Sequence, residues 1–173
     1  MTRVTTMPAD RGRWLAIDWG ERRIGLALSD PTGTIASPAG VIERRAGKRA
    51  PVAELVRRAV SLEARGIVMG LPLDGEGDET VRSAECRRVA AELARRTALP
   101  VSLLDERFTT AAALRAVRDM GGSTRGRKGD LDALAATVLL QQALRMQSLP
   151  TVDPDSPHST DDSAPPPDAA SSN

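Results

Sequence analysis

The sequence predicts an α/β fold on one mixed five-stranded sheet, with the first three strands antiparallel, the later strands parallel, and helices flanking the sheet. Three short apolar stretches, 14–20, 24–30 and 34–42, follow one another through short connections, which is typical of an antiparallel meander. Two fully apolar stretches, 66–73 and 101–106, alternate with amphipathic segments, which indicates parallel strands connected by helices.

Four further segments have the patterns of helices. In 51–65 apolar residues recur at helical spacing, and Pro51 suits the first turn. The segment 80–97 is amphipathic, 109–120 begins with threonines that can cap a helix, and 130–146 is strongly helical. The predicted order is therefore three strands, then helix, strand, helix, strand and two helices.

Length and cysteine content exclude several classes of protein. The chain has 173 residues, which suits one ordinary domain with tails. A single Cys excludes a disulfide framework and a Cys-rich zinc site. No apolar run is long enough to span a bilayer, and the N-terminus has no apolar signal region. We therefore expect a cytoplasmic protein with no membrane contact.

Charge and proline content divide the chain into three parts. We expect a flexible N-terminus over 1–12, one folded domain over 13–148, and a disordered acidic tail over 149–173. The tail holds five Asp, six of the twelve prolines and no Lys or Arg. Without it, 24 basic and 18 acidic residues leave a net charge of +6, which suits a polyanionic partner. Because aromatic residues are nearly absent, a nucleic acid would be held by its phosphates rather than by stacked bases.

Acidic residues occur at three places where a site could form. Asp18 interrupts an apolar strand, and Asp132 lies in the first turn of the last helix, just after Asp130. Asp105 and Glu106 close a buried strand, where only one of the two can face a given site. Each has an ordinary structural alternative, either a solvent-facing strand end or a favourable charge at a helix start. In an open α/β sheet, however, the three can meet beyond the carboxyl ends of the parallel strands. Asp132 shares a helix face with small alanines that allow close packing on the sheet, whereas Asp130 is expected to cap the helix.

The residue types limit the chemistry of such a site. Three carboxylates without a usable His or Cys suit Mg²⁺ or Mn²⁺ rather than Zn²⁺. The one histidine, His158, lies in the tail, which excludes Ser–His–Asp catalysis and argues against a histidine general base.

Four motifs, in this order, resemble those of the YqgF/RuvX family, described as pre-16S rRNA nucleases and as Holliday-junction-resolvase-like proteins. The resemblance covers about residues 15–144 and implies an RNase H-like fold. It places the family's catalytic and metal-binding acids on Asp18, Glu106 and Asp132. The motifs are AIDWGERRIGLALSD (16–30), IVMGLPLDGEGDE (67–79), LLDERFTTAAA (103–113) and KGDLDALAA (128–136).

The chemistry that this resemblance implies is metal-assisted hydrolysis of a phosphodiester bond with Mg²⁺ or Mn²⁺. Lys128, Arg107 and Arg23 are then candidates to bind phosphate oxygens, although solvated surface charge is the alternative for each and the favoured one for Arg23. Two positions depart from the family's usual pattern: Asp74 stands where Asn is common, and Asp130 where an apolar residue is common.

Several functions stay open at this stage. Family resemblance favours processing of the 5′ end of pre-16S rRNA. The alternatives are a Holliday junction resolvase or other DNA-repair nuclease acting on branched DNA, for which a homodimer is expected, and a non-catalytic nucleic-acid-binding factor. An actin-like ATP-binding protein is a further rival, but such proteins need two domains of this kind, whereas we expect one here.

Overall fold

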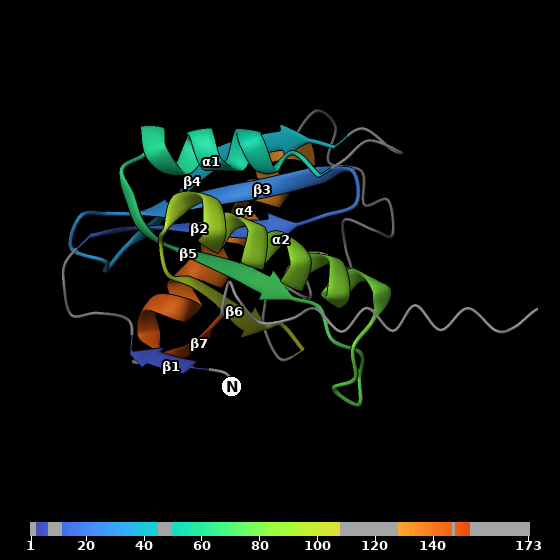
Figure 1. The fold of residues 1–173 in the computed structure, drawn as a ribbon. Helices are drawn as coiled ribbons and strands as arrows, with labels where there is room; N and C mark the ends of the chain where they lie inside the picture. Colours follow the sequence, from blue (N-terminus) through green and yellow to red (C-terminus); the bar gives the residue numbers. More distant parts are fainter. Residues whose placement is uncertain (1–2, 7–11, 45–49, 108–127, 147, 153–173) are drawn as a thin grey trace, which may run out of the picture.

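The computed structural model describes residues 3–6, 12–44, 50–107, 128–146 and 148–152 (Figure 1). Seven strands and three helices occur within these ranges. In chain order they are β1 (Arg3–Thr6), β2 (Arg13–Trp19), β3 (Arg23–Ser29), β4 (Ala36–Glu43), α1 (Val52–Ser61), β5 (Ala64–Leu71), α2 (Val81–Thr97), β6 (Val101–Asp105), α4 (Lys128–Arg145) and β7 (Ser148–Thr151). The helix predicted over 109–120 lies outside the described residues.

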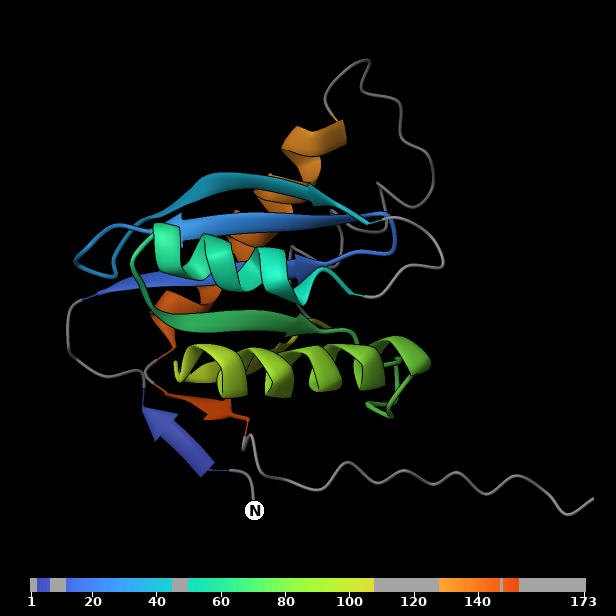
Figure 2. The same cartoon turned by 45° about the horizontal axis from the view of Figure 1, so that its top comes forward.

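One mixed sheet organises the fold, with the strand order β1-β7-β6-β5-β2-β3-β4. Strands β2, β3 and β4 form the predicted antiparallel meander, and β5 and β6 run parallel to β2. The predicted α/β fold with its mixed five-stranded sheet is thus confirmed. The helices flank it as expected, because α1 and α2 cover one face while α4 crosses the other (Figure 1, Figure 2).

Two short strands extend this sheet beyond the prediction. Residues 3–6, within the expected N-terminal segment 1–12, pair antiparallel with residues 148–151, where the expected domain meets the tail, and they form β1 and β7. Strand β7 also borders β6, and the Val152 N–H donates to the Val101 carbonyl at 2.8 Å. These contacts are made by backbone groups, so the short segments need no alternating apolar pattern that a sequence could reveal. The rest of the tail, 153–173, lies outside the described residues.

Helix α1 ends earlier than its apolar pattern predicts. The pattern continues to residue 65, but α1 stops at Ser61 and Glu63 adopts a positive φ of 55°. This left-handed residue reverses the chain within a few residues and lets β5 begin at Ala64. Among the helices that the structure describes, none is both long and apolar enough to cross a membrane.

Side chains alternate between two cores along each central strand. Leu15, Ile17 and Trp19 of β2 face the core under α1 and α2, whereas Trp14 and Ala16 face the core under α4. Continuing this alternation places Asp18 on the α4 face, where it is fully buried. The sheet therefore presents an acid to the interior between β2 and α4.

Candidate active site

Gly25 brings helix α4 against the strand pair that carries Asp18. Asp18 lies opposite Gly25 in the β2–β3 register. A Cβ atom at Gly25 would collide with the backbone carbonyl of Asp132 in α4. Only glycine can therefore stand at this point, and its absence of a side chain places Asp132 beside the Asp18–Gly25 pair.

Gly25 lies inside β3, and the turn between β2 and β3 comes before it. A lone glycine within a strand pattern is the signal that indicates such a close backbone approach.

Asp132 is fully buried, and its charge is balanced by the partly exposed side chain of Arg23. Its Oδ2 lies 2.9 Å from Nε of Arg23, whose side chain is 28% exposed. Arg23 opens β3, so both members of this pair lie at the edge of the sheet where β2 ends. The structure therefore brings Arg23 directly to an acid of the candidate site, where surface charge was the favoured interpretation.

The helix face predicted for Asp132 packs on the sheet. The residues that share this face are buried, namely Ala135, Ala136, Leu139 and Ala143. The expected helix start was wrong by two residues, because α4 begins at Lys128. Asp130 is thus the third residue of α4 and not its cap. Gly129 lowers helix propensity and so conceals this earlier start in the sequence.

Glu106 follows the end of β6 at the same edge of the sheet. Its backbone N–H donates to the carbonyl of Leu71, the last residue of β5, at 3.3 Å. Because β2, β5 and β6 are parallel, their carboxyl ends lie along one edge. Glu106 is 2% exposed, and the alternation past Leu104 places it on the α4 side. All three acids are therefore buried at this edge.

The donor atoms of these acids suit a hard divalent cation, but their present arrangement does not form a coordination site. Buried carboxylates carry a high desolvation cost unless a cation or a hydrogen-bond donor compensates it. The described residues nevertheless contain no group of three or more His, Cys, Asp or Glu side chains that could hold a metal ion as they stand. The fit to Mg²⁺ or Mn²⁺ is thus one of chemistry, not of coordination geometry.

Arg107, another candidate for phosphate binding, is held by Asp105 in an ion pair. Its Nε and Nη2 donate to the Asp105 carboxylate at 3.0 and 2.8 Å, and its backbone N–H donates to Oδ1 at 3.0 Å. These hydrogen bonds from Arg107 hold the pKa of Asp105 below its ordinary value. By alternation Asp105 faces the α2 side, away from the face of Glu106. Lys128, the third candidate, contributes the first backbone position of α4.

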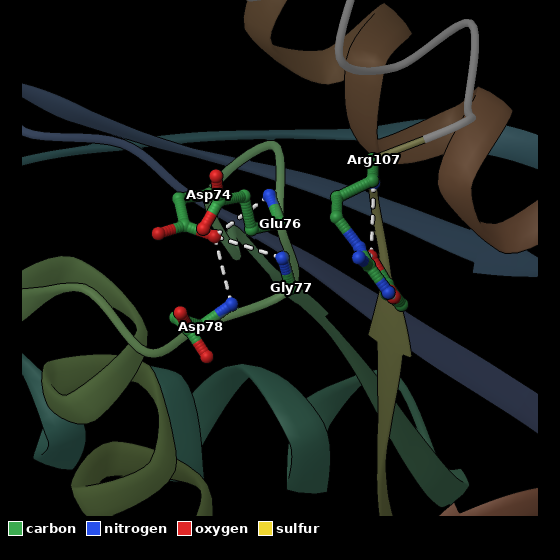
Figure 3. A network of polar contacts seen from close by, with 6 residues as sticks. Asp74, Glu76, Gly77, Asp78 and Arg107 are labelled. Atoms are coloured by element: carbon green, nitrogen blue, oxygen red, sulfur yellow. Dashed lines mark hydrogen bonds and ion pairs between the residues drawn. The ribbon is translucent and has the colours of Figure 1, made fainter.

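The Arg107 guanidinium also lies against the loop that follows β5. A Cβ at Gly77 would collide with Nη1 of Arg107 and would displace this flexible side chain, and the positive φ of 97° at Gly77 itself favours glycine. Asp74 organises the loop, since its Oδ1 accepts the backbone N–H groups of Glu76, Gly77 and Asp78 at 2.7 to 3.0 Å. Figure 3 shows Arg107 beside the loop residues whose backbone Asp74 holds. The acid at position 74 therefore has a local structural role.

Comparison with known proteins shows relatives over most of the chain. The RuvX family, described as Holliday junction resolvase, matches residues 12–146. A protein of Clavibacter michiganensis named "Putative pre-16S rRNA nuclease" is 38% identical over 136 residues, covering 79% of this chain and 84% of that protein. A Streptomyces coelicolor protein of the same name is 39% identical over 140 residues, covering 79% and 82%.

A solved structure supports the fold independently. RuvC of T. thermophilus, determined in complex with a Holliday junction substrate, superposes with a TM-score of 0.52 at 14% identity, covering 80% of this chain and 99% of that one. That likeness concerns the fold alone. The match over 12–146 and the relatives that are 38–39% identical over 136 to 140 residues show the family: this chain belongs to the RuvX family of nucleases.

Proposed function

We propose that this protein is a divalent-metal-dependent nuclease that hydrolyses phosphodiester bonds in RNA and processes the 5′ end of pre-16S rRNA in the cytoplasm. The observation that carries the proposal is the contact at Gly25, which seats Asp132 next to buried Asp18. Packing two acids together in the interior costs a protein stability, so the burial of Asp18 and Asp132 at this edge supports a chemical role. The names of the relatives in Clavibacter and Streptomyces support RNA as the substrate.

In this proposal each side chain at the edge has a distinct task. Asp18, Glu106 and Asp132 would hold Mg²⁺ or Mn²⁺, and a bound ion of this kind activates water and stabilises charge on the scissile phosphate. Arg23 orients the Asp132 carboxylate and keeps part of its guanidinium exposed for a phosphate oxygen. Lys128 and Arg107 are further phosphate ligands in this proposal. To bind a phosphate, Arg107 would have to release the Asp105 carboxylate that it now contacts.

Resolution of Holliday junctions is the second candidate, and the description of the matching family favours it. Cleaving a four-way junction symmetrically needs two active sites related by a two-fold axis, so this alternative requires a homodimer. Processing one RNA end requires a single site. The two candidate functions therefore differ in both properties: a homodimer that cleaves junctions, or a single active site that cleaves RNA.

A cleavage panel separates these functions. Purified protein is given a pre-16S rRNA fragment, linear duplex DNA and a four-way DNA junction, each with Mg²⁺, with Mn²⁺ and with EDTA. We expect metal-dependent cleavage of the RNA near the mature 5′ end and no paired nicks in the junction. If a dimer makes symmetric nicks in the junction, the proposed function becomes Holliday junction resolution and RNA processing is rejected. Binding without cleavage of any substrate would overturn the nuclease proposal.

A matched pair of variants tests which acid of α4 holds the metal. Asp132→Asn should lower the cleavage rate by orders of magnitude and weaken Mn²⁺ binding, because Asp132 is the buried acid beside Gly25. Asp130→Asn is the control and should keep most activity, since position 130 lies about 200° away around the helix. If Asp130→Asn is the inactive protein, the ligand assignment within α4 is wrong.

A further inference from the structure

A cluster of three side chains lies on the sheet face opposite Asp18. Trp19, the next residue of β2, is fully buried and donates its Nε1–H to Oε2 of Glu85 in α2 at 3.1 Å. Arg44, which follows β4, donates from Nη2 to Oε1 of the same carboxylate at 2.6 Å. Its guanidinium carbon lies 4.3 Å from the centre of the Trp19 ring. We call Trp19, Arg44 and Glu85 the Trp19 clamp.

The clamp also holds backbone groups on both sides of the turn after β2. Arg44 Nη1 donates to the Gly20 carbonyl at 2.8 Å, and the Arg44 backbone N–H donates to the Arg22 carbonyl at 2.8 Å. From α2, Arg82 Nη2 donates to the Trp19 carbonyl at 3.3 Å. The carbonyls of the two residues that follow Asp18, and one just before Arg23, are therefore fixed from outside the hairpin.

The charges within the clamp are compatible with a fixed geometry. Arg44 is 15% exposed and Glu85 is 31% exposed, so the pair is shielded on the Trp19 side and open on the other. Burial raises the pKa of Glu85, but the hydrogen bonds from Trp19 and Arg44 outweigh it and hold that pKa below its ordinary value. The carboxylate is therefore ionised at neutral pH and accepts two charge-assisted or polar hydrogen bonds at once.

We propose that the Trp19 clamp is a positioning device for the active site, which fixes the end of β2 and thereby sets where Asp18 and Arg23 point on the opposite face. This inference rests on the proposed metal-dependent activity and deepens it. Asp18 and Trp19 are adjacent and face opposite sides, so a shift of the Trp19 backbone moves Asp18. A misplacement of about 1 Å can cost a hundredfold in rate.

The far end of the same strands supplies a matched control. There Gln141 of α4 accepts the Ala36 N–H at 3.1 Å and donates to the Thr34 carbonyl at 3.0 Å. This side chain also ties a helix to the backbone of a hairpin, but it does so at the edge away from Asp18. If the contacts of Glu85 only stabilise the fold, Glu85→Ala and Gln141→Ala should have equal effects on Mn²⁺ affinity and kcat.

The experiment compares these variants in melting temperature, in Mn²⁺ affinity measured by calorimetry, and in kcat and KM on the RNA that the wild type cleaves. We expect both to lower the melting temperature, but only Glu85→Ala to weaken Mn²⁺ binding and to reduce kcat by about tenfold to a hundredfold. Glu85→Gln should recover part of kcat, because its amide oxygen still accepts one hydrogen bond. Arg44→Lys keeps the positive charge but loses the planar guanidinium, so its kcat should lie between those of Glu85→Ala and Glu85→Gln.

Two outcomes overturn the inference in distinguishable ways. If Glu85→Ala, or Arg44→Lys where the alanine variant does not fold, matches Gln141→Ala in Mn²⁺ affinity and kcat, the clamp has no positioning role and the proposed function stands. If the wild type neither binds Mn²⁺ nor cleaves RNA, the proposed function fails and the clamp inference fails with it.

Discussion

Two aspartates of the same sequence motif lie near opposite ends of strand β3, in opposite surroundings. At one end, Asp18 of β2 lies opposite Gly25, fully buried and next to Asp132. At the other end, Asp30 follows β3 in a surface turn, where its carboxylate accepts the backbone N–H groups of Thr34 at 2.7 Å and Ile35 at 2.8 Å. The first acid is buried in the interior near α4, and the second lies among backbone donors.

This difference separates a chemical role from a structural one. The backbone N–H of Ile35, the hydroxyl of Thr32 and the N–H of Thr34 hold the pKa of Asp30 well below its ordinary value, so its charge stabilises the turn. Asp18 and Asp132 are buried together, with the guanidinium of Arg23 as the counter-charge of Asp132. Such an arrangement costs stability, and proteins retain that cost where function requires it.

The largest expected effect is on cleavage at the buried end. Asp18→Asn should lower the cleavage rate by orders of magnitude while leaving the melting temperature unchanged or higher, because it relieves repulsion with Asp132. Asp30→Asn is the control and should cleave normally but melt at a lower temperature. Initial rates at saturating Mn²⁺ and thermal melts measure both. Wild-type cleavage by Asp18→Asn would show that Asp18 is not part of the site.

The next effect concerns the contact that defines the buried end. Gly25→Ala places a Cβ against the Asp132 carbonyl, so α4 must move away from β3. We expect a loss of about 1–3 kcal/mol in the free energy of unfolding, typical of overpacking, together with a loss of cleavage. Gly75→Ala should change neither, because nothing lies within 4 Å of a Cβ there. Denaturant titrations and cleavage rates provide the comparison, and normal activity in Gly25→Ala would contradict the proposed seating of Asp132.

The central fold and the acids could be predicted from sequence because both depend on local patterns. Alternating and continuous apolar stretches are sufficient to predict β2 to β6, and an acid inside such a stretch is conspicuous at Asp18. The helical spacing of Asp132 with its alanines likewise predicts the face that packs on the sheet. These predictions need only the period of a strand or a helix.

What could not be predicted depends on contacts between distant residues. The contact of Gly25 with Asp132 and the bonds of Glu85 to Trp19 and Arg44 join residues 41 to 107 positions apart in the chain. Nothing in the neighbourhood of Glu85 distinguishes it from other surface acids of an amphipathic helix. Strands β1 and β7 were missed for a related reason, since their pairing is made by the backbone and leaves no side-chain pattern.

A smaller effect appears in the dependence of stability on pH. Because the pKa of Asp30 is lower in the folded protein than its ordinary value of 3.8, its contribution is fully present above that value and is lost as the pH falls below it. Melting temperatures of the wild type and Asp30→Asn, compared from about pH 6 to about pH 3, should therefore converge as the solution becomes more acidic. A difference that stays constant over this range would show that the charge of Asp30 does not stabilise its turn.

The smallest effect concerns two parts of the C-terminal segment. Residues 148–151 pair with the sheet, and we expect 153–173 to add nothing to stability. Removing 153–173 should leave the melting temperature unchanged, because the composition of this stretch offers little apolar surface to dock. Removing 148–173 also deletes β7, which pairs with β1 and bonds to β6, and should lower the melting temperature by several degrees. Both truncated proteins should bind RNA at least as tightly as the full chain at low salt, since five negative charges are gone. Equal melting temperatures for the two truncations would mean that β7 adds nothing to the sheet, and a large loss from the shorter deletion would mean that 153–173 belongs to the fold.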